Sequence, residues 1–198
     1  MILITDLQYF SPSIFFFHLS NFKYCVFDQY EHYQKMSFRN RCTILGGNGP
    51  IGLTVPLVGG RNQKTVMKDV RILNKEKWQE RHWKTITSCY NKSPWFEHFR
   101  DELEKLFLKK HEFLVDWNLS CFYWVTDKLS INTYCSLSDG YVENYDMNVY
   151  DDCRGKLMPS TINQEFPDVE RYPQVFEDRF GFVPNLSVLD YLFCVGPK

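Results

Sequence analysis

The stretch Ser-Phe-Arg-Asn-Arg-Cys at residues 37–42 places two guanidinium groups and a carboxamide within six residues. Arg39 and Arg41 could hold a phosphate or a carboxylate, because a guanidinium forms two parallel hydrogen bonds with such groups. Strand alternation puts Asn40 on the opposite, apolar face. Asn40 therefore either fixes a loop or contacts a ligand, and the two arginines are either anion ligands or supports.

Lys68 presents a second anomaly, in the segment Thr-Val-Met-Lys-Asp-Val-Arg-Ile at residues 65–72. The segment is predicted as a strand, and alternation then places Lys68 with Val66 and Val70 on an apolar face. An unpaired buried ammonium costs several kcal/mol, so we expect a carboxylate or an anionic ligand beside Lys68. The alternative is that its side chain extends to solvent from an edge strand.

Two residues could act as a general base. His82 shares an apolar stripe with Trp78 and Ile86 in a predicted helix, where it is either a base or a hydrogen-bonded core residue. Asp28 lies at the C-terminal end of the buried strand predicted at residues 23–28. The other histidines lack metal-ligand spacing, and the seven cysteines include no C-x-x-C pair, so neither a metal site nor a disulfide framework is expected.

The elements that position these residues begin with a predicted βαβ unit. Residues 2–5 are an apolar strand, a helix capped by Ser11 or Ser13 follows, and residues 23–28 form the next strand. Ligands of open α/β sheets bind outside the carboxyl ends of the strands. We therefore expect three side chains at that edge: Gln8, Tyr9 and Asp28.

A hairpin and several helices complete the prediction. Two strands flank Gly-Gly-Asn-Gly, and the pair Asn48-Gly49 favours a type I′ turn. Helices are expected after Asn74 as cap, from Ser93-Pro94, over about 112–129, and from a cap at Asn185 or Ser187 to Gly196-Pro197. Residues 131–137 could be a strand, and the remainder of 130–183 is expected to form long loops. The predicted fold is one α/β domain over 1–198, with a hairpin-containing mixed sheet packed with central helices.

Composition excludes several functions. A net charge of −1 argues against a nucleic-acid partner. The apolar start contains Asp6 and Pro12 and is too short to span a bilayer, so no membrane insertion is expected. An odd number of cysteines fits a cytoplasmic protein. Phosphate-binding loops, nucleophile elbows and zinc-protease motifs do not occur in the sequence.

The chain resembles the WbqC-like family of bacterial proteins. The resemblance rests on LQYFSPSIFFFHL, DQYEHYQKMSFRNRCTI, LTVPL, TVMKDVRI, the Trp78–Phe99 segment and FVPNLSVLDYLFCVGP. It implies a role in polysaccharide or O-antigen biosynthesis, with transfer of an amino acid such as glycine to an amino sugar as the activity suggested for the family. The positions matching its motifs are Gln8, Tyr9, Pro12, Tyr33, Lys35, Arg39, Asn40, Arg41, Lys68, His82, Asn185 and Asp190. The chain departs from the family between about 137 and 170.

Two main hypotheses follow. In the first, a group-transfer enzyme binds a sugar nucleotide or an activated amino acid. His82 or Asp28 is then the catalytic base, and the expected substrate-binding residues are Gln8, Tyr9, Tyr33, Lys35, Arg39, Asn40, Arg41 and Lys68. In the second, the protein is a non-catalytic module that binds a sugar, a nucleotide or a protein partner. The sequence identifies no cofactor and no oligomeric state.

Overall fold

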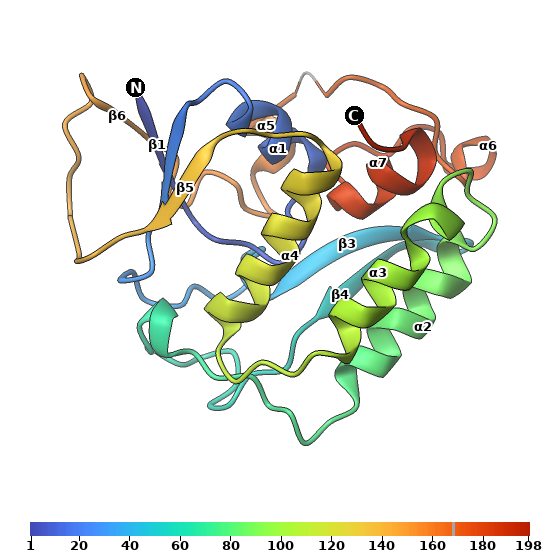
Figure 1. Cartoon of the computed structure of the whole chain (residues 1–198), viewed down its shortest axis with the longest axis horizontal. Helices are drawn as coiled ribbons and strands as arrows, with labels where there is room; N and C mark the ends of the chain where they lie inside the picture. The colour runs from blue at the N-terminus through green and yellow to red at the C-terminus, as the bar shows by residue number, and fades with distance from the viewer. Residues whose placement is uncertain (168) are drawn as a thin grey trace.

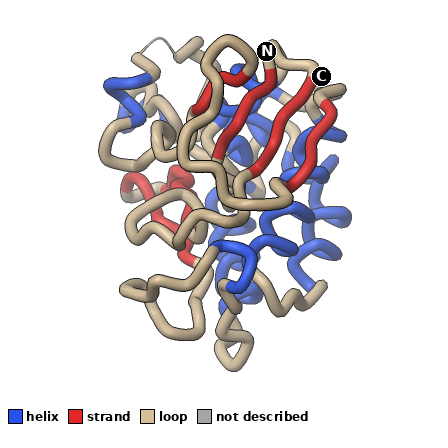
Figure 2. Tube along the Cα trace, turned by 90° about the vertical axis from the view of Figure 1, so that its left-hand side faces the viewer, coloured by secondary structure: helices blue, strands red, loops and turns tan. Residues whose placement is uncertain are grey.

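Four parallel strands form the main sheet, in the order β5-β2-β1-β6. The computed structural model describes residues 1–167 and 169–198, and Figure 1 shows the elements in space. Figure 2 shows the four strands side by side with helices behind them. The mixed α/β fold is confirmed. The strands are β1 (Ile2–Thr5), β2 (Tyr24–Phe27), β5 (Tyr134–Leu137) and β6 (Tyr150–Asp152).

The predicted βαβ unit is confirmed, with α1 (Ser13–Leu19) between β1 and β2. Pro12, rather than Ser11 or Ser13, occupies the position before the helix, and no side chain caps it. A proline is tolerated here because the N–H that it lacks would have no acceptor inside the helix.

The hairpin consists of β3 (Arg41–Gly46) and β4 (Gly49–Thr54), which pair antiparallel. It forms a two-stranded sheet of its own beside the parallel sheet, instead of joining it. The prediction of a type I′ turn was wrong. Positive φ occurs at Gly49 (113°) and not at Asn48, so the left-handed residue follows the turn rather than forming its centre.

The strand predicted at 65–72 was wrong. The segment contains a 3₁₀ turn, η1 (Met67–Asp69), flanked by isolated bridges. The backbone N–H groups of Met67 and Lys68 donate to the carbonyls of Glu31 and Gln29, which dock the turn on the loop after β2. The turn interrupts strand alternation, so Met67 and Val70 are buried while Lys68 is exposed.

The helices α2 (Trp78–Tyr90), α3 (Phe96–Leu108) and α4 (Leu114–Lys128) occupy the predicted regions. The expected caps Asn74 and Ser93 were wrong, because α2 and α3 begin after Lys77 and Trp95, without side-chain caps. The last helix, α7 (Val188–Val195), is capped by Ser187, whose hydroxyl accepts from the Leu189 N–H. It ends at Gly196 with φ 102°, as predicted.

The region 130–183 contains more structure than expected. The strand near 131–137 is confirmed as β5, but β6, α5 (Ile162–Glu165) and α6 (Glu177–Phe180) lie where long loops were predicted. β6 has the sequence Tyr-Asp-Asp, so it shows no apolar pattern, and only its parallel pairing with β1 makes it a strand.

Aromatic contacts hold the layers together. Phe27 of β2 packs on Phe122 of α4 with 4.8 Å between ring centroids, and Phe16 of α1 stacks on the same ring. Trp117 of α4 packs edge-on against Trp78 of α2. Within the described part of the chain, we find no helix with the length and apolarity needed to cross a membrane.

Candidate binding groove at the carboxyl edge of the parallel sheet

Every strand of the parallel sheet delivers a polar residue to its carboxyl edge. Asp28 follows β2 and is completely buried. It accepts hydrogen bonds from Arg154 Nη1 (2.8 Å), Ser138 Oγ (3.3 Å) and the Tyr30 N–H (2.8 Å). Ser138 follows β5 and Arg154 follows β6. Asp6 follows β1, and its Oδ2 accepts from the Gly155 N–H. The strand ends therefore meet in one polar cluster.

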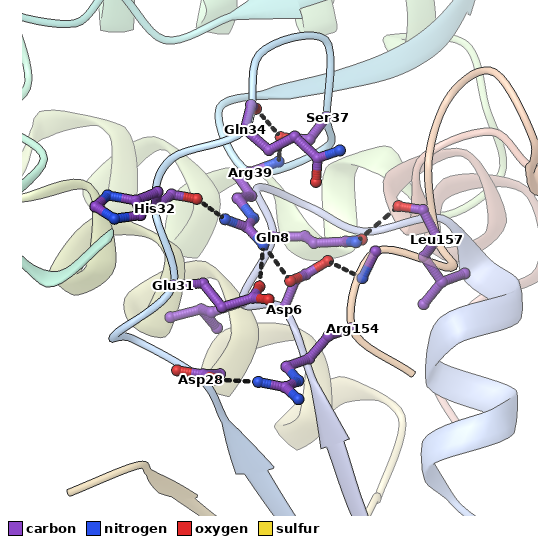
Figure 3. Close-up of polar contacts among 12 residues, drawn as sticks. Asp6, Gln8, Asp28, Glu31, His32, Gln34, Ser37, Arg39, Arg154 and Leu157 are labelled. Carbon is purple, nitrogen blue, oxygen red and sulfur yellow. Dashed lines mark hydrogen bonds and ion pairs between the residues drawn. The ribbon is translucent and has the colours of Figure 1, made fainter. Parts of the chain in front are cut away.

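Arg39 connects this cluster to the loop after β2. Its Nη2 lies 2.5 Å from both Asp6 Oδ1 and Glu31 Oε2, and its Nη1 donates to the His32 carbonyl at 2.6 Å. Figure 3 shows the guanidinium between the two carboxylates, with the Arg154–Asp28 pair nearby. Arg39 is only 2% exposed, so its charge is neutralised locally instead of being offered to solvent.

The cluster has more acid than base. Arg154 also pairs with Asp152 at 2.7 Å, so the two arginines face four carboxylates: Asp6, Asp28, Glu31 and Asp152. Glu31 differs from the others because it reaches a hollow. Burial raises its pKa and the nearby Asp6 adds to the effect, while Arg39 opposes it. The cluster therefore presents a carboxyl of raised pKa to the groove, rather than a spare cation.

A groove of about 760 Å³ opens beside this cluster. Its lining is rich in aromatic side chains and comprises Tyr30, Glu31, His32, Tyr33, Gln34, Arg39, Val66 and Tyr141. A second hollow adjoins it, because both share Tyr33 and Gln34, and its remaining residues are Lys35, Arg61, Asn62 and Gln63. The floor is thus formed by Arg39 and Glu31, the walls by tyrosines, and one end by basic residues.

Three predicted site residues meet here. Tyr33 and Arg39 line the groove, and Lys35 lines the adjoining hollow. Asn40 points inward, as strand alternation predicted. It accepts a hydrogen bond from the Tyr33 hydroxyl (2.9 Å) and donates to the Val55 carbonyl (2.9 Å). Its position favours the structural role, in which Asn40 holds a groove tyrosine in place.

Gln8 and Arg41 lie outside the lining. Gln8 is buried next to the cluster and donates to the Leu157 carbonyl at 3.1 Å, as Figure 3 shows. Its Oε1 has no partner among the described residues. Arg41 is half-buried on β3, donates to Met36 Sδ and lines neither hollow, whereas the charge of Arg39 is paired with Asp6 and Glu31.

His82 and Tyr9 lie together in the core. The Tyr9 hydroxyl pairs with His82 Nδ1 at 3.0 Å, and Trp78 packs edge-on against the imidazole. Burial lowers the pKa of His82 to about 4. His82 lines neither hollow of the groove. In these positions neither His82 nor Tyr9 reaches the groove. The geometry therefore does not support the predicted catalytic role of His82 or the predicted stacking role of Tyr9 at this site.

Of the two alternatives for Lys68, burial beside an anion was wrong and exposure to solvent is confirmed, although on the 3₁₀ turn η1 and not on an edge strand. Lys68 is exposed, with its Nζ 4.8 Å from the centre of the Tyr30 ring. Since Tyr30 lines the groove, the cation lies at the rim and is not inside the protein.

Several residues of the cluster were missed from sequence. Asp6 follows the first strand just as Asp28 follows the second, so the same argument would have found it. Glu31 and Tyr141 lie in loops without a pattern. Arg154 could be placed only by recognising β6 as a strand.

Together, the fold and the cluster define an α/β protein with a tyrosine-lined groove at the carboxyl edge of a small parallel sheet. Residues 8–155 match the WbqC-like protein family, which covers most of the chain, and the protein belongs to this family. The match includes Glu31, Arg39 and Arg154 but ends before α7, so the resemblance noted for the C-terminal stretch lies outside it. No curated protein and no solved structure matched the chain.

Proposed function

We propose that the protein is a group-transfer enzyme of bacterial surface-polysaccharide biosynthesis, and that its groove binds an anionic sugar derivative such as a sugar nucleotide. Family membership supports the biological setting. The observation that carries the proposal is the composition of the groove, which joins tyrosines, a carboxyl of raised pKa and unpaired cations at the rim.

The tyrosines suit a ring-shaped ligand. Tyr30, Tyr33 and Tyr141 provide apolar faces for a sugar or a base and hydroxyl groups for hydrogen bonding. Tyr33 is held by Asn40, so at least one wall is rigid before a ligand arrives.

The cations suit a phosphate or a carboxylate on the same ligand. Lys35 and Arg61 line the basic end, and Lys68 lies over Tyr30. None of the three forms an ion pair with a described residue. Because Arg39 is already neutralised by Asp6 and Glu31, an anionic group is better placed at this rim than at the floor.

Glu31 is the proposed general base. In an aminoacyl transfer, an amine of the sugar attacks the carbonyl carbon of an activated amino acid. The new C–N bond forms as the bond to the activating group breaks, that group leaves with the bonding electron pair, and a base must take the amine proton. Glu31 lines the groove, whereas Asp28 is completely buried against Arg154 and His82 lies in the core. Our proposal therefore moves the catalytic role from the two residues expected from sequence to Glu31.

Binding is tested by calorimetric titration with a panel of nucleotide-linked sugars and amino sugars. Replacing Tyr141 by Ala should weaken binding about fivefold or more, because stacking of a base on an aromatic ring contributes about 1–3 kcal/mol. Tyr134→Ala is the matched control, since Tyr134 is exposed on β5 away from the groove lining. If no member of the panel binds, or if both variants bind equally well, the groove is not the ligand site.

Catalysis is tested with Glu31→Gln. Arg39 keeps Asp6 as a partner, so the fold should survive. Transfer of a radiolabelled amino acid to the bound sugar should fall about 100-fold or more, while sugar affinity stays within a few fold. Binding without turnover in the wild type would instead favour the non-catalytic module that the sequence left open.

A further inference from the structure

On the far side of β6 from Arg154, three side chains with metal-binding atoms meet. His18 Nε2 lies 3.9 Å from Cys153 Sγ and 3.8 Å from Asp151 Oδ2. Cys153 Sγ and Asp151 Oδ1 are 3.5 Å apart. With one ligand atom taken from each residue, a nitrogen, a sulfur and an oxygen lie within 4.8 Å of one another, and none of the three residues lines the groove.

The fold explains why they meet. Asp151 and Cys153 are two residues apart along an extended segment, so both side chains project from the same face, while Asp152 projects from the other face to Arg154. The N–H of Cys153 donates to the Ile4 carbonyl and continues the ladder with β1. α1 crosses this face and presents His18 near its last turn.

We infer that His18, Asp151 and Cys153 form a binding site for a divalent metal ion of the Zn²⁺ class, a site independent of the proposed transferase function. A tetrahedral Zn²⁺, with bonds of about 2.3 Å to sulfur and about 2.0 Å to nitrogen and oxygen, requires its ligand atoms to lie roughly 3.3–3.6 Å apart. The closest approaches exceed this by a few tenths of an ångström, but the two to Asp151 involve different oxygens, Oδ2 for His18 and Oδ1 for Cys153. A rotation of the Asp151 carboxylate and small rotamer shifts are therefore needed to bring one oxygen, the nitrogen and the sulfur from within 4.8 Å of one another to ligand spacing.

The chemistry of the ligands selects the metal. A thiolate and an imidazole favour Zn²⁺, Co²⁺ or Fe²⁺ over Mg²⁺ and Ca²⁺, which prefer oxygen. Binding forms a metal–sulfur bond and releases the thiol proton of Cys153 to the buffer. Three protein ligands leave a fourth position for water or a ligand.

Of the groups around the three side chains, two aromatic rings favour metal binding and one ammonium group opposes it. The rings of Phe22 and Phe166 flank the imidazole of His18, which fixes its orientation. The Lys156 ammonium lies 3.9 Å from both Asp151 Oδ1 and Cys153 Sγ, where it repels a metal ion. Lys156 is close to half exposed, so its long side chain can move into solvent when the ion enters.

Sequence spacing could not reveal this site. His18 precedes Asp151 by 133 positions, and Asp151 in β6 and Cys153 directly after it lie in the region predicted as loop. The earlier expectation of no metal site rested on spacing along the chain, while the site depends on the parallel pairing of β6 with β1.

Co²⁺ is the probe for the experiment, because a thiolate ligand gives a charge-transfer absorption that water or carboxylate ligands do not. The full-length protein is treated with a chelator, desalted under reducing conditions and titrated with CoCl₂. We expect one equivalent of Co²⁺, displacement by one equivalent of Zn²⁺, and a rise in Tm of about 3 °C or more with excess Zn²⁺.

The variants decide between this site and adventitious binding. Cys153→Ser should abolish the charge-transfer band, and His18→Gln should weaken binding at least about tenfold. Cys89→Ser and His98→Gln are the matched controls outside the triangle and should bind as the wild type. A wild type without the band, or a band that persists in Cys153→Ser, overturns the assignment.

Lys156→Met provides a test that does not depend on a ligand variant folding. Removing a positive charge at about 4 Å should tighten Zn²⁺ binding about fivefold. Weaker binding in Lys156→Met would make Lys156 a supporting residue and would overturn the geometry proposed here.

Discussion

The carboxyl edge of the parallel sheet and the interior beside α7 both bury carboxylates, but they satisfy them differently. At the edge, Asp6 and Asp28 are paired with the guanidinium groups of Arg39 and Arg154. Beside α7, Asp190 accepts hydrogen bonds from Tyr90 (2.7 Å), Tyr172 (2.9 Å) and Gln174 (3.1 Å), with no cation among these partners.

The difference has an electrostatic consequence. Burial raises the pKa of Asp190, and the three hydrogen bonds only partly offset this effect. At the edge, each carboxylate faces a guanidinium instead of neutral donors. The interior cluster contributes to the fold, whereas the edge cluster combines structure with the candidate site.

The largest effect is expected where a counter-charge is removed. Arg39→Met leaves Asp6 and Glu31 facing each other without a cation, and we expect a loss of about 3–5 kcal/mol in the free energy of unfolding, measured by urea denaturation. Arg100→Met, which breaks an exposed pair with Glu97, is the control and should cost under about 1 kcal/mol. Equal losses in both variants would remove the distinction between the two environments.

A smaller effect is expected at His82, a neutral core group. Its folded pKa is about 4 and its ordinary value is 6.5, so between these values the unfolded chain binds the proton more strongly. Stability should therefore fall as pH drops from 7 to 4, by on the order of 3 kcal/mol from this group.

The contribution of His82 to stability is isolated by comparing how the free energy of unfolding depends on pH in the wild type and in two variants. His82→Gln should flatten the profile between pH 7 and 4 relative to the wild type, while His98→Gln on the surface of α3 should not. Identical slopes in all three proteins would mean that His82 is accessible to protons in the folded state.

The interior cluster itself should be less sensitive than the edge. Asp190→Asn keeps the shape but turns an acceptor into a donor facing Tyr90, Tyr172 or Gln174. We expect a loss of about 1–3 kcal/mol by urea denaturation. The exposed Asp101→Asn should be neutral. A loss larger than that of Arg39→Met would reverse the ranking of the two clusters.

The smallest effect is expected at Lys68. Its contact with Tyr30 is exposed, so Lys68→Met should cost no more than about 0.5–1 kcal/mol of folding free energy in thermal denaturation. A clear gain in stability would indicate instead that the ammonium is buried and unpaired, as strand alternation had suggested.

How much the sequence predicts depends on whether a residue's neighbours along the chain determine its position. The βαβ unit and the hairpin follow from apolar runs and turn residues, and these place Asp28 at the sheet edge and Asn40 inside. Lys68 was misplaced because hydrogen bonds to Gln29 and Glu31, rather than the local pattern, determine the 3₁₀ turn.

The rest depends on distant pairing. β6 contains two aspartates in three residues and carries no apolar signal, yet it completes the sheet, contributes Asp151 and positions Cys153 and Arg154 directly after it. The pKa of Glu31 is likewise raised by burial and by the nearby Asp6, and no local motif predicts either effect.

The pairing of Asp28 with Arg154 spans 126 positions of the chain and has a consequence for biosynthesis. On the ribosome, β1 and β2 emerge long before β6, so β1 lacks its edge partner and Asp28 lacks its counter-charge until residue 154 is translated. The open edge of β1 is then a surface on which nascent chains can associate. Release of chains truncated before β6 should therefore yield aggregates, and the sheet-edge site is among the last parts of the domain to form.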